Sequence, residues 1–134
     1  METLIGLDVG TTAAKALLFD LHGRQLAQAS QSYTLLTPQE GWVEQDPQAL
    51  WQAVVAVLRS VADSLGPGDA VLGISLSSQG GTTIPLDAAL QPVYNAMSWM
   101  DQRARQEYLQ VKESFGAEAI YHITGWSLMP ALPL

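Results

Sequence analysis

The amino-acid sequence predicts an α/β fold in which strands come first and a helix then leads to a further strand. Short apolar runs near the amino terminus alternate with glycine turns, as strands and hairpins do. Residues 47–65 repeat apolar side chains at helical spacing, and residues 71–76 form a nearly continuous apolar run. With 134 residues, 48% of them hydrophobic, the chain can form one domain with a core of its own.

Three strands are predicted before the helix. Residues 4–7 form the first, and residues 14–21 and 24–33 form a hairpin whose turn is His22-Gly23. We interpret His22 as a solvated turn residue, since no partner for it is in view.

The helix has clear start and stop signals. Asp46 is a suitable N-cap, Pro47 occupies the first helical position, and residues 66–68 end the helix as Gly-Pro-Gly. Its apolar face, which includes Trp51, is expected to pack against the sheet. The apolar run 71–76 is typical of a strand that helices cover on both faces.

The last third of the chain predicts further short elements. Residues 83–86 and 91–98 are expected to be short strands around a turn. A helix is expected to begin near Gln102, with Phe115 in its core, and a second helix to run from 116 to 124.

The most informative segment follows the first strand. Asp8 lies at the strand end, Gly10 permits a tight turn, and Thr11 and Thr12 add two hydroxyl groups. Backbone N–H groups and hydroxyls can donate to phosphate oxygens, while the carboxylate can hold a hydrated magnesium ion. The alternative is a β-hairpin whose glycine and threonines serve only the turn and the strands.

Composition excludes several classes of function. The net charge is −7 and the six Lys and Arg are scattered, which argues against nucleic acid as a partner. There is no cysteine, so disulfides and thiolate metal sites are excluded. No secretory signal and no membrane-spanning segment is evident, and we expect a cytoplasmic protein.

A second polar region follows the apolar strand. The loop at residues 77–82 lies at the carboxyl end of that strand, where open α/β sheets collect ligands; a plain turn is the alternative. Further on, Trp99 offers an apolar face to a sugar ring, and Asp101 and Arg103 offer a carboxylate and a forked donor to hydroxyls or to each other. Equally, Asp101 could cap the following helix and Arg103 could be a solvated or structurally paired residue.

Taken together and in order, these motifs resemble the FGGY family of carbohydrate kinases. The matching set spans essentially the whole chain and consists of Ile5-Gly6-Leu7-Asp8-Val9-Gly10-Thr11-Thr12, Lys15, Phe19-Asp20, Gly41-Trp42-Val43-Glu44-Gln45-Asp46-Pro47, Trp51, Ser77-x-Gln79 and Trp99-x-Asp101-x-Arg103.

The resemblance implies a ribonuclease H-like domain of the sugar kinase, actin and Hsp70 superfamily, with three antiparallel strands followed by parallel strands and helices. It implies transfer of the γ-phosphate of ATP, with Mg²⁺, to a hydroxyl of a sugar or polyol. By position, Asp8 would orient the metal, and Gly10, Thr11, Thr12 and Lys15 would lie at the ATP phosphates.

The resemblance also implies an acceptor site, formed by Gln79, Gly80, Gly81, Trp99, Asp101 and Arg103. Here the chain departs from its relatives. At the two glycine positions of this loop, the pattern of xylulokinases has Met-His and that of glycerol kinases has Arg-Glu. The two glycines of this chain would enlarge the pocket and remove hydrogen-bond partners. Neither xylulose nor glycerol can therefore be assigned from this loop.

Family members are several hundred residues long. The resemblance places the general base and the adenine region beyond Leu134, so residues 1–134 are expected to be a truncated first domain, without the second domain and inactive alone. Uncovered apolar surface would then favour self-association into a homo-oligomer. Two alternatives stay open: an actin-like or Hsp70-like ATPase switch, and a non-catalytic binding or assembly module.

Overall fold

The computed structural model describes residues 1–130, which divide into two compact units. The first unit combines Met1–Thr34 with Pro47–Gln79, and the second combines Leu35–Asp46 with the described residues from Gly80 onward. The chain therefore leaves the first unit after the third strand, and returns to it for the helix and the fourth strand of the sheet.

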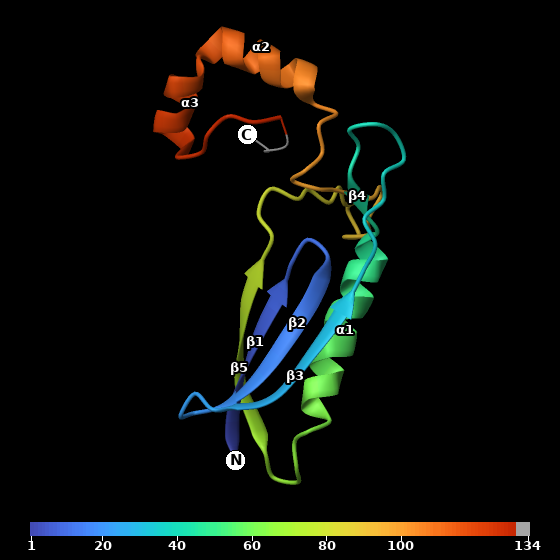
Figure 1. Ribbon diagram of the computed structural model, residues 1–134, viewed down its shortest axis with the longest axis vertical. Coiled ribbons are helices and arrows are strands. Elements are labelled where there is room, and N and C mark those ends of the chain that lie inside the picture. The colour runs from blue at the N-terminus through green and yellow to red at the C-terminus, as the bar shows by residue number, and fades with distance from the viewer. Residues whose placement is uncertain (131–134) are drawn as a thin grey trace. The chain divides into compact units, whose positions relative to one another are not determined.

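The first unit contains a four-stranded sheet in the order β3-β2-β1-β5 (Figure 1). Strands β1 (Glu2–Val9), β2 (Ala13–Asp20) and β3 (Gln25–Ser32) are antiparallel neighbours, and β5 (Ala70–Ser78) pairs with β1 in parallel. The predicted order of three antiparallel strands followed by a parallel one is confirmed.

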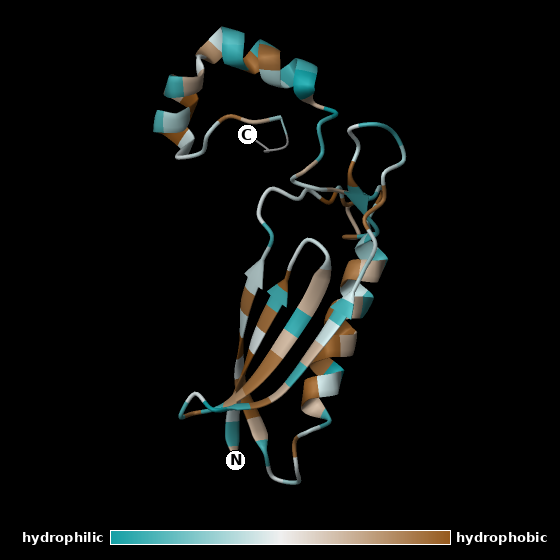
Figure 2. Ribbon diagram, in the orientation of Figure 1, coloured by the Kyte–Doolittle hydropathy of each residue, from teal (hydrophilic) through white to brown (hydrophobic). Residues whose placement is uncertain are grey.

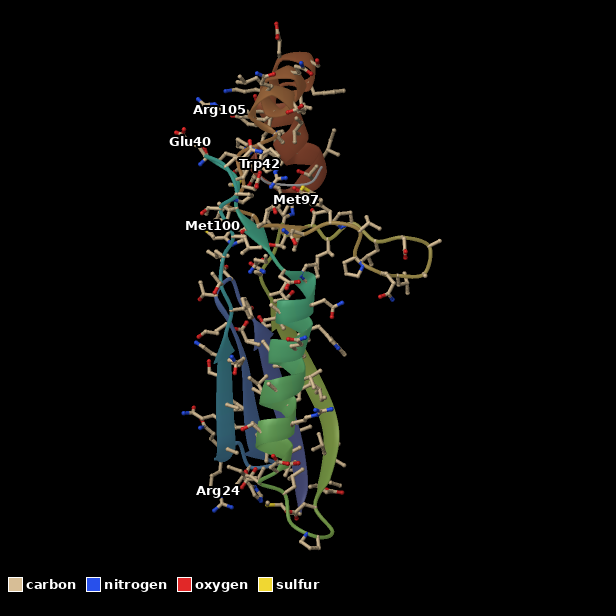
Figure 3. The ribbon with its side chains drawn as sticks, turned by 90° about the vertical axis from the view of Figure 1, so that its right-hand side faces the viewer. Arg24, Glu40, Trp42, Met97, Met100 and Arg105 are labelled. Atoms are coloured by element: carbon tan, nitrogen blue, oxygen red, sulfur yellow. The ribbon has the colours of Figure 1, made fainter. Side chains whose placement is uncertain are left out.

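Helix α1 (Pro47–Ala62) lies along one face of this sheet, mainly over β2 and β3 (Figures 1 and 3). Side chains alternate between the two faces of a strand, so every second residue of β1 and β2 points at the helix. Ile5 pairs with Leu18, and Leu7 with Ala16, on that face. These side chains form one buried cluster with the helix, made of Ile5, Leu7, Ala14, Ala16, Leu18, Ala53, Val57 and Val61.

The predicted start of α1 at Pro47 is confirmed, but the prediction that Trp51 packs in the core is wrong. The buried residues of the helix are Leu50, Ala53, Val57 and Val61, which follow one stripe at spacings of three and four. Trp51 follows Leu50 directly, about 100° further around the helix, and is 64% exposed.

The prediction that β5 is covered on both faces is also wrong for the described residues. The pairing with β1 places Ile74 beside Ile5 and Leu76 beside Leu7, on the face that carries α1. The helix packs over β2 and β3 instead, so Ile74 and Leu76 stay 54% and 65% exposed. Figure 2 shows hydrophobic colour on β5 as well as on the strands beside it.

The second unit contains the short antiparallel pair β4 (Glu44–Gln45) and β6 (Ala96–Met97), and two helices, α2 (Arg105–Phe115) and α3 (Ala117–Thr124). Isolated bridges join Thr83 to Met97 and Leu86 to Pro92, where short strands over residues 83–86 and 91–98 were expected. Helix α3 ends at Gly125 as predicted.

Helix α2 differs from its prediction in its start and in its burial. Its N-cap is Ala104, without a side-chain capping bond, whereas the sequence predicted a start near Gln102. Phe115, expected in the core, is 69% exposed, and α2 buries none of its residues. No helix in the described part of the chain is both long and apolar enough to cross a membrane.

Candidate phosphate and acceptor sites

The first candidate site is the turn between β1 and β2. The Gly10 N–H donates to the Ala13 carbonyl oxygen at 3.0 Å, which closes a turn over Thr11 and Thr12. Tyr33, just after β3, donates its own N–H to the Thr12 carbonyl and its hydroxyl to the Gly10 carbonyl. The turn is thus held from a neighbouring segment, while Thr12 itself is exposed.

Asp8 lies on the face of the sheet opposite α1. Its neighbours Leu7 and Ile5 alternate with it toward the helix, so the carboxylate of Asp8 points the other way. Across the antiparallel pair its partner is Lys15, and across the parallel pair its partner is Ser77. The structure therefore brings two predicted site residues of opposite charge, Asp8 and Lys15, to directly opposite positions.

The backbone and the Asp8 side chain pass close to Gly10. A Cβ atom built on Gly10 would lie 3.3 Å from the Ala13 oxygen and 3.7 Å from Oδ2 of Asp8. The missing side chain thus leaves a small cradle between the turn and the carboxylate.

This cradle fits a phosphate-bound magnesium ion. Magnesium keeps several waters and is often held by one or two carboxylates together with substrate phosphates. Within residues 1–130, no three His, Asp or Glu side chains gather as a metal-binding group. The Asp8 carboxylate beside the turn is the type of ligand that a phosphate-bound magnesium ion accepts.

Gln79 belongs to the same neighbourhood. Its N–H donates to the Val9 carbonyl oxygen at 2.9 Å, which extends the β1–β5 ladder past Asp8. The backbone of Gln79, a residue predicted to contact the acceptor, therefore lies beside the predicted phosphate turn.

The second candidate site is the loop that carries Trp99, in the second unit. Trp99 is 42% exposed, and its N–H donates to the Thr82 hydroxyl at 3.4 Å. A surface pocket here is lined by Trp99, Met100, Asp101, Gln102, Met129 and Pro130. Figure 3 shows Trp42, Met97 and Met100 gathered around β4.

Asp101 is buried and does not cap α2. Its carboxylate accepts the Val43 N–H at 2.8 Å and the Arg103 N–H at 2.8 Å. It also accepts Nε of Arg103 at 2.9 Å and Nη2 at 2.8 Å, a forked ion pair. The sequence allowed Arg103 either to bind acceptor hydroxyls or to be a structurally paired residue. These contacts are those of a structurally paired residue.

Glu44 completes this cluster, and the sequence analysis assigned it no role. The carboxylate, only 2% exposed, accepts Arg103 Nη2 at 2.6 Å, the Tyr94 hydroxyl at 3.0 Å and Asn95 Nδ2 at 2.8 Å. The Arg103 guanidinium also stacks 3.7 Å from the centre of the Trp42 ring. In the sequence, Glu44 lies within the segment Gly41–Pro47, which supports the family resemblance. That segment does not indicate which residues Glu44 contacts.

The charges of this cluster support one another. Burial alone would raise the pKa of Glu44, but hydrogen bonds from Asn95, Arg103 and Tyr94 outweigh it and leave the pKa below its usual range. The pKa of Asp101 is lowered in the same way, by Arg103 and the Val43 N–H against the effect of burial. The pKa of Arg103 is raised, chiefly by its hydrogen bonds to Asp101.

Gly80 and Gly81 have different local reasons to be glycine. Gly81 has φ of 75°, a left-handed conformation that disfavours other residues. Gly80 needs no such conformation, and a Cβ there would meet the Trp126 ring at 3.8 Å, an ordinary contact. Bulk is therefore tolerated better at Gly80 than at Gly81.

The strand order of the first unit and the tight turn after β1 are those of a sugar-kinase-like, ribonuclease H-like fold. Comparison with known proteins agrees. Residues 3–134 match the N-terminal domain of the FGGY family of carbohydrate kinases, and the chain belongs to this family.

Relatives include a glycerol kinase of Marinomonas sp. (strain MWYL1), 34% identical over 95% of this chain. Among solved structures, gluconate kinase from Lactobacillus acidophilus superposes with a TM-score of 0.91 at 31% identity over 98% of the chain. Xylulose kinase from Rhodospirillum rubrum superposes with a TM-score of 0.90 at 30% identity over 97% of the chain. The chain spans only about a quarter of each: 26%, 26% and 27% of their lengths.

Proposed function

We propose that this chain supplies the phosphate-binding turn and part of the acceptor site of an ATP-dependent carbohydrate kinase. The observation that carries the proposal is the turn after β1, where Asp8, the Gly10 cradle and Lys15 come together within a family of carbohydrate kinases. Residues 1–134 are then the first part of a longer catalytic architecture, as the quarter-length match with relatives suggests.

Phosphoryl transfer depends mostly on positioning and on stabilising charge. N–H groups of the turn would donate hydrogen bonds to phosphate oxygens in the cradle beside Asp8, and the Asp8 carboxylate would hold magnesium. A bound Mg²⁺ ion neutralises the charge of the transferred phosphoryl group. Lys15, exposed and opposite Asp8, would add a positive charge on the same face.

The acceptor is proposed to be a sugar or polyol. Trp99 offers an exposed indole face to the apolar side of a ring, and Gln79, Gly80 and Gly81 would line the approach to the hydroxyls. We propose cytoplasmic localisation on the same basis, since ATP and phosphorylated sugars belong to intracellular metabolism.

The test uses amide resonances of the purified chain, titrated with Mg·ATP at millimolar concentration. We expect the largest shifts at Gly10, Thr11 and Thr12, and a loss of their Mg²⁺ dependence in Asp8→Asn. Asp63→Asn is the control, because Asp63 is an exposed carboxylate in the same unit, directly after α1. Shifts centred elsewhere, or none at these residues, would contradict the phosphate site.

Titration with a panel of pentoses, hexoses and polyols tests the acceptor half. We expect shifts at Trp99 and Gln79 with at least one of these compounds. Nucleotide shifts without any response to the panel would instead favour an ATPase switch.

A further inference from the structure

The loop that displays Trp99 is held at both of its ends by one residue of another segment. Ser98 donates its N–H to the Val43 carbonyl at 2.9 Å, and Asp101 accepts the Val43 N–H at 2.8 Å. Both anchors are buried, at 1% and 5% exposure, whereas Trp99 between them is 42% exposed. Residues 99 and 100 therefore form a short display loop whose position is set by Val43.

Glu44, the next residue, holds the same loop through a second route. Its carboxylate binds Arg103, and the forked Arg103 side chain binds Asp101, which is one end of the display loop. Trp42, on the other side of Val43, stacks on the same guanidinium at 3.7 Å. Three consecutive residues, Trp42, Val43 and Glu44, thus converge on the loop.

The charges explain why this arrangement is specific. A buried carboxylate is costly unless its oxygens are well hydrogen-bonded, and Glu44 accepts three hydrogen bonds from side chains 50 to 59 positions away in the chain. Nε and Nη2 of Arg103 are directed to the carboxylates of Glu44 and Asp101. An arginine held in this way fixes geometry through its rigid fork, which a lysine cannot reproduce.

We propose that Glu44 is a positioning residue of the acceptor site: through Arg103 and Asp101 it fixes the loop that presents Trp99 to the sugar. Arg103 then acts on the acceptor through Asp101 and Trp99, and does not itself grip a hydroxyl. This inference rests on the proposed sugar-binding role of Trp99, but the positioning itself can be measured without any sugar.

The first measurement follows the Trp99 indole N–H and the Met100 and Asp101 amide resonances in Glu44→Gln. This change keeps the shape of the side chain and removes its charge. We expect these resonances to shift and their hydrogen exchange to accelerate about tenfold, the loss expected for one charged hydrogen bond. Amides of β1, β2 and β3 should not move, which separates a local change from unfolding.

Glu40→Gln is the matched control. Glu40 lies in the same segment, is exposed, and points away from the cluster in Figure 3, so the charge change is identical and the contacts are absent. We expect it to leave the Trp99 resonance unchanged. If Glu44→Gln also leaves Trp99 and Asp101 unchanged, or if both variants shift them equally, the inference is wrong.

The second measurement is the dissociation constant for the sugar that perturbs Trp99 most. We expect it to rise about tenfold in Glu44→Gln and in Arg103→Lys, and no further in the double variant, because both act through one chain of contacts. Additive losses would show that Arg103 binds the sugar directly and would overturn the inference. If Glu44→Gln fails to fold, Arg103→Lys alone decides, by the same shift of the Trp99 resonance.

The two proposals fail in different ways. A wild-type chain that binds no sugar, with Trp99 still shifted by Glu44→Gln, contradicts the acceptor function and supports the positioning. A wild-type chain that binds sugar with an affinity unaffected by Glu44→Gln supports the function and overturns the positioning.

Discussion

Charged side chains in this chain occur in two different structural environments. Asp8 and Lys15 face each other across neighbouring strands, on the face of the sheet opposite α1. Glu44 and Asp101 are buried and fully engaged with Arg103. The first pair is suited to binding a charged ligand, and the second group to fixing the shape of a loop.

The buried carboxylates predict a pH dependence of stability. Because the folded-state pKa values of Glu44 and Asp101 are lowered, their stabilising contribution is complete above the ordinary carboxyl pKa of about 4. It is lost as the pH falls through the lowered folded-state values. At pH values below about 4, we expect the urea concentration at the unfolding midpoint of the second unit to decrease with falling pH. This decrease should be less steep in Glu44→Gln.

Amide exchange or tryptophan fluorescence during urea unfolding at pH 7, 5, 4 and 3 would measure this. Glu40→Gln, whose carboxylate is exposed, should keep the slope of the wild type. An unchanged slope in Glu44→Gln would show that Glu44 does not contribute to acid sensitivity.

At the level of elements, α1 and the sheet contribute most of the apolar burial in the first unit. Leu18 of β2 is 1% exposed, and its β1 partner Ile5 is 5% exposed. The helix stripe Ala53, Val57 and Val61 closes this cluster. The core therefore depends on β2 and α1 more than on β5.

We expect Leu18→Ala to reduce the free energy of unfolding by about 2–5 kcal/mol, through lost burial and the cavity it leaves. Leu21→Ala is the control, because Leu21 is 52% exposed in the adjacent turn; its effect should stay within about 0.5 kcal/mol. Urea denaturation followed by far-UV circular dichroism measures both. Equal losses in the two variants would contradict the assignment of the core.

Strand β5 leaves apolar side chains without cover in the described residues. Ile74 and Leu76 are more than half exposed on a strand that also forms the edge of the sheet. Exposed apolar edges of this kind pair readily with other chains. We therefore expect the purified chain to self-associate at micromolar concentration.

Sedimentation velocity would measure this self-association. Ile74→Thr with Leu76→Thr should shift the chain toward the monomer, since threonine keeps strand propensity and lowers hydrophobicity. Leu21→Thr, an exposed leucine away from β5, should leave the distribution unchanged. A chain that is already monomeric at these concentrations would contradict the prediction.

At the scale of the whole molecule, the chain matches about a quarter of its kinase relatives. Alignment of the reacting groups and exclusion of water each contribute several kcal/mol to phosphoryl transfer, and both depend on surrounding protein. We expect no sugar-dependent ADP release from the 134-residue chain with Mg·ATP and the acceptor panel. A full-length xylulose kinase is the positive control, and turnover at its rate by this chain would show that residues 1–134 contain a complete active site.

Local patterns were enough to predict strands β1, β2 and β3, the start of α1 at Pro47 and the end of α3 at Gly125, because alternation, helical spacing and turn residues act over short stretches of chain. The phosphate turn and Trp99 were singled out because their residue types carry recognisable chemistry. Contacts between distant segments decided the rest. The packing of α1 on β2 and β3, which exposes Trp51 and β5, depends on how two surfaces meet. The pairing of Glu44 with Arg103, 59 positions apart, depends on burial and charge in three dimensions, which no local periodicity encodes.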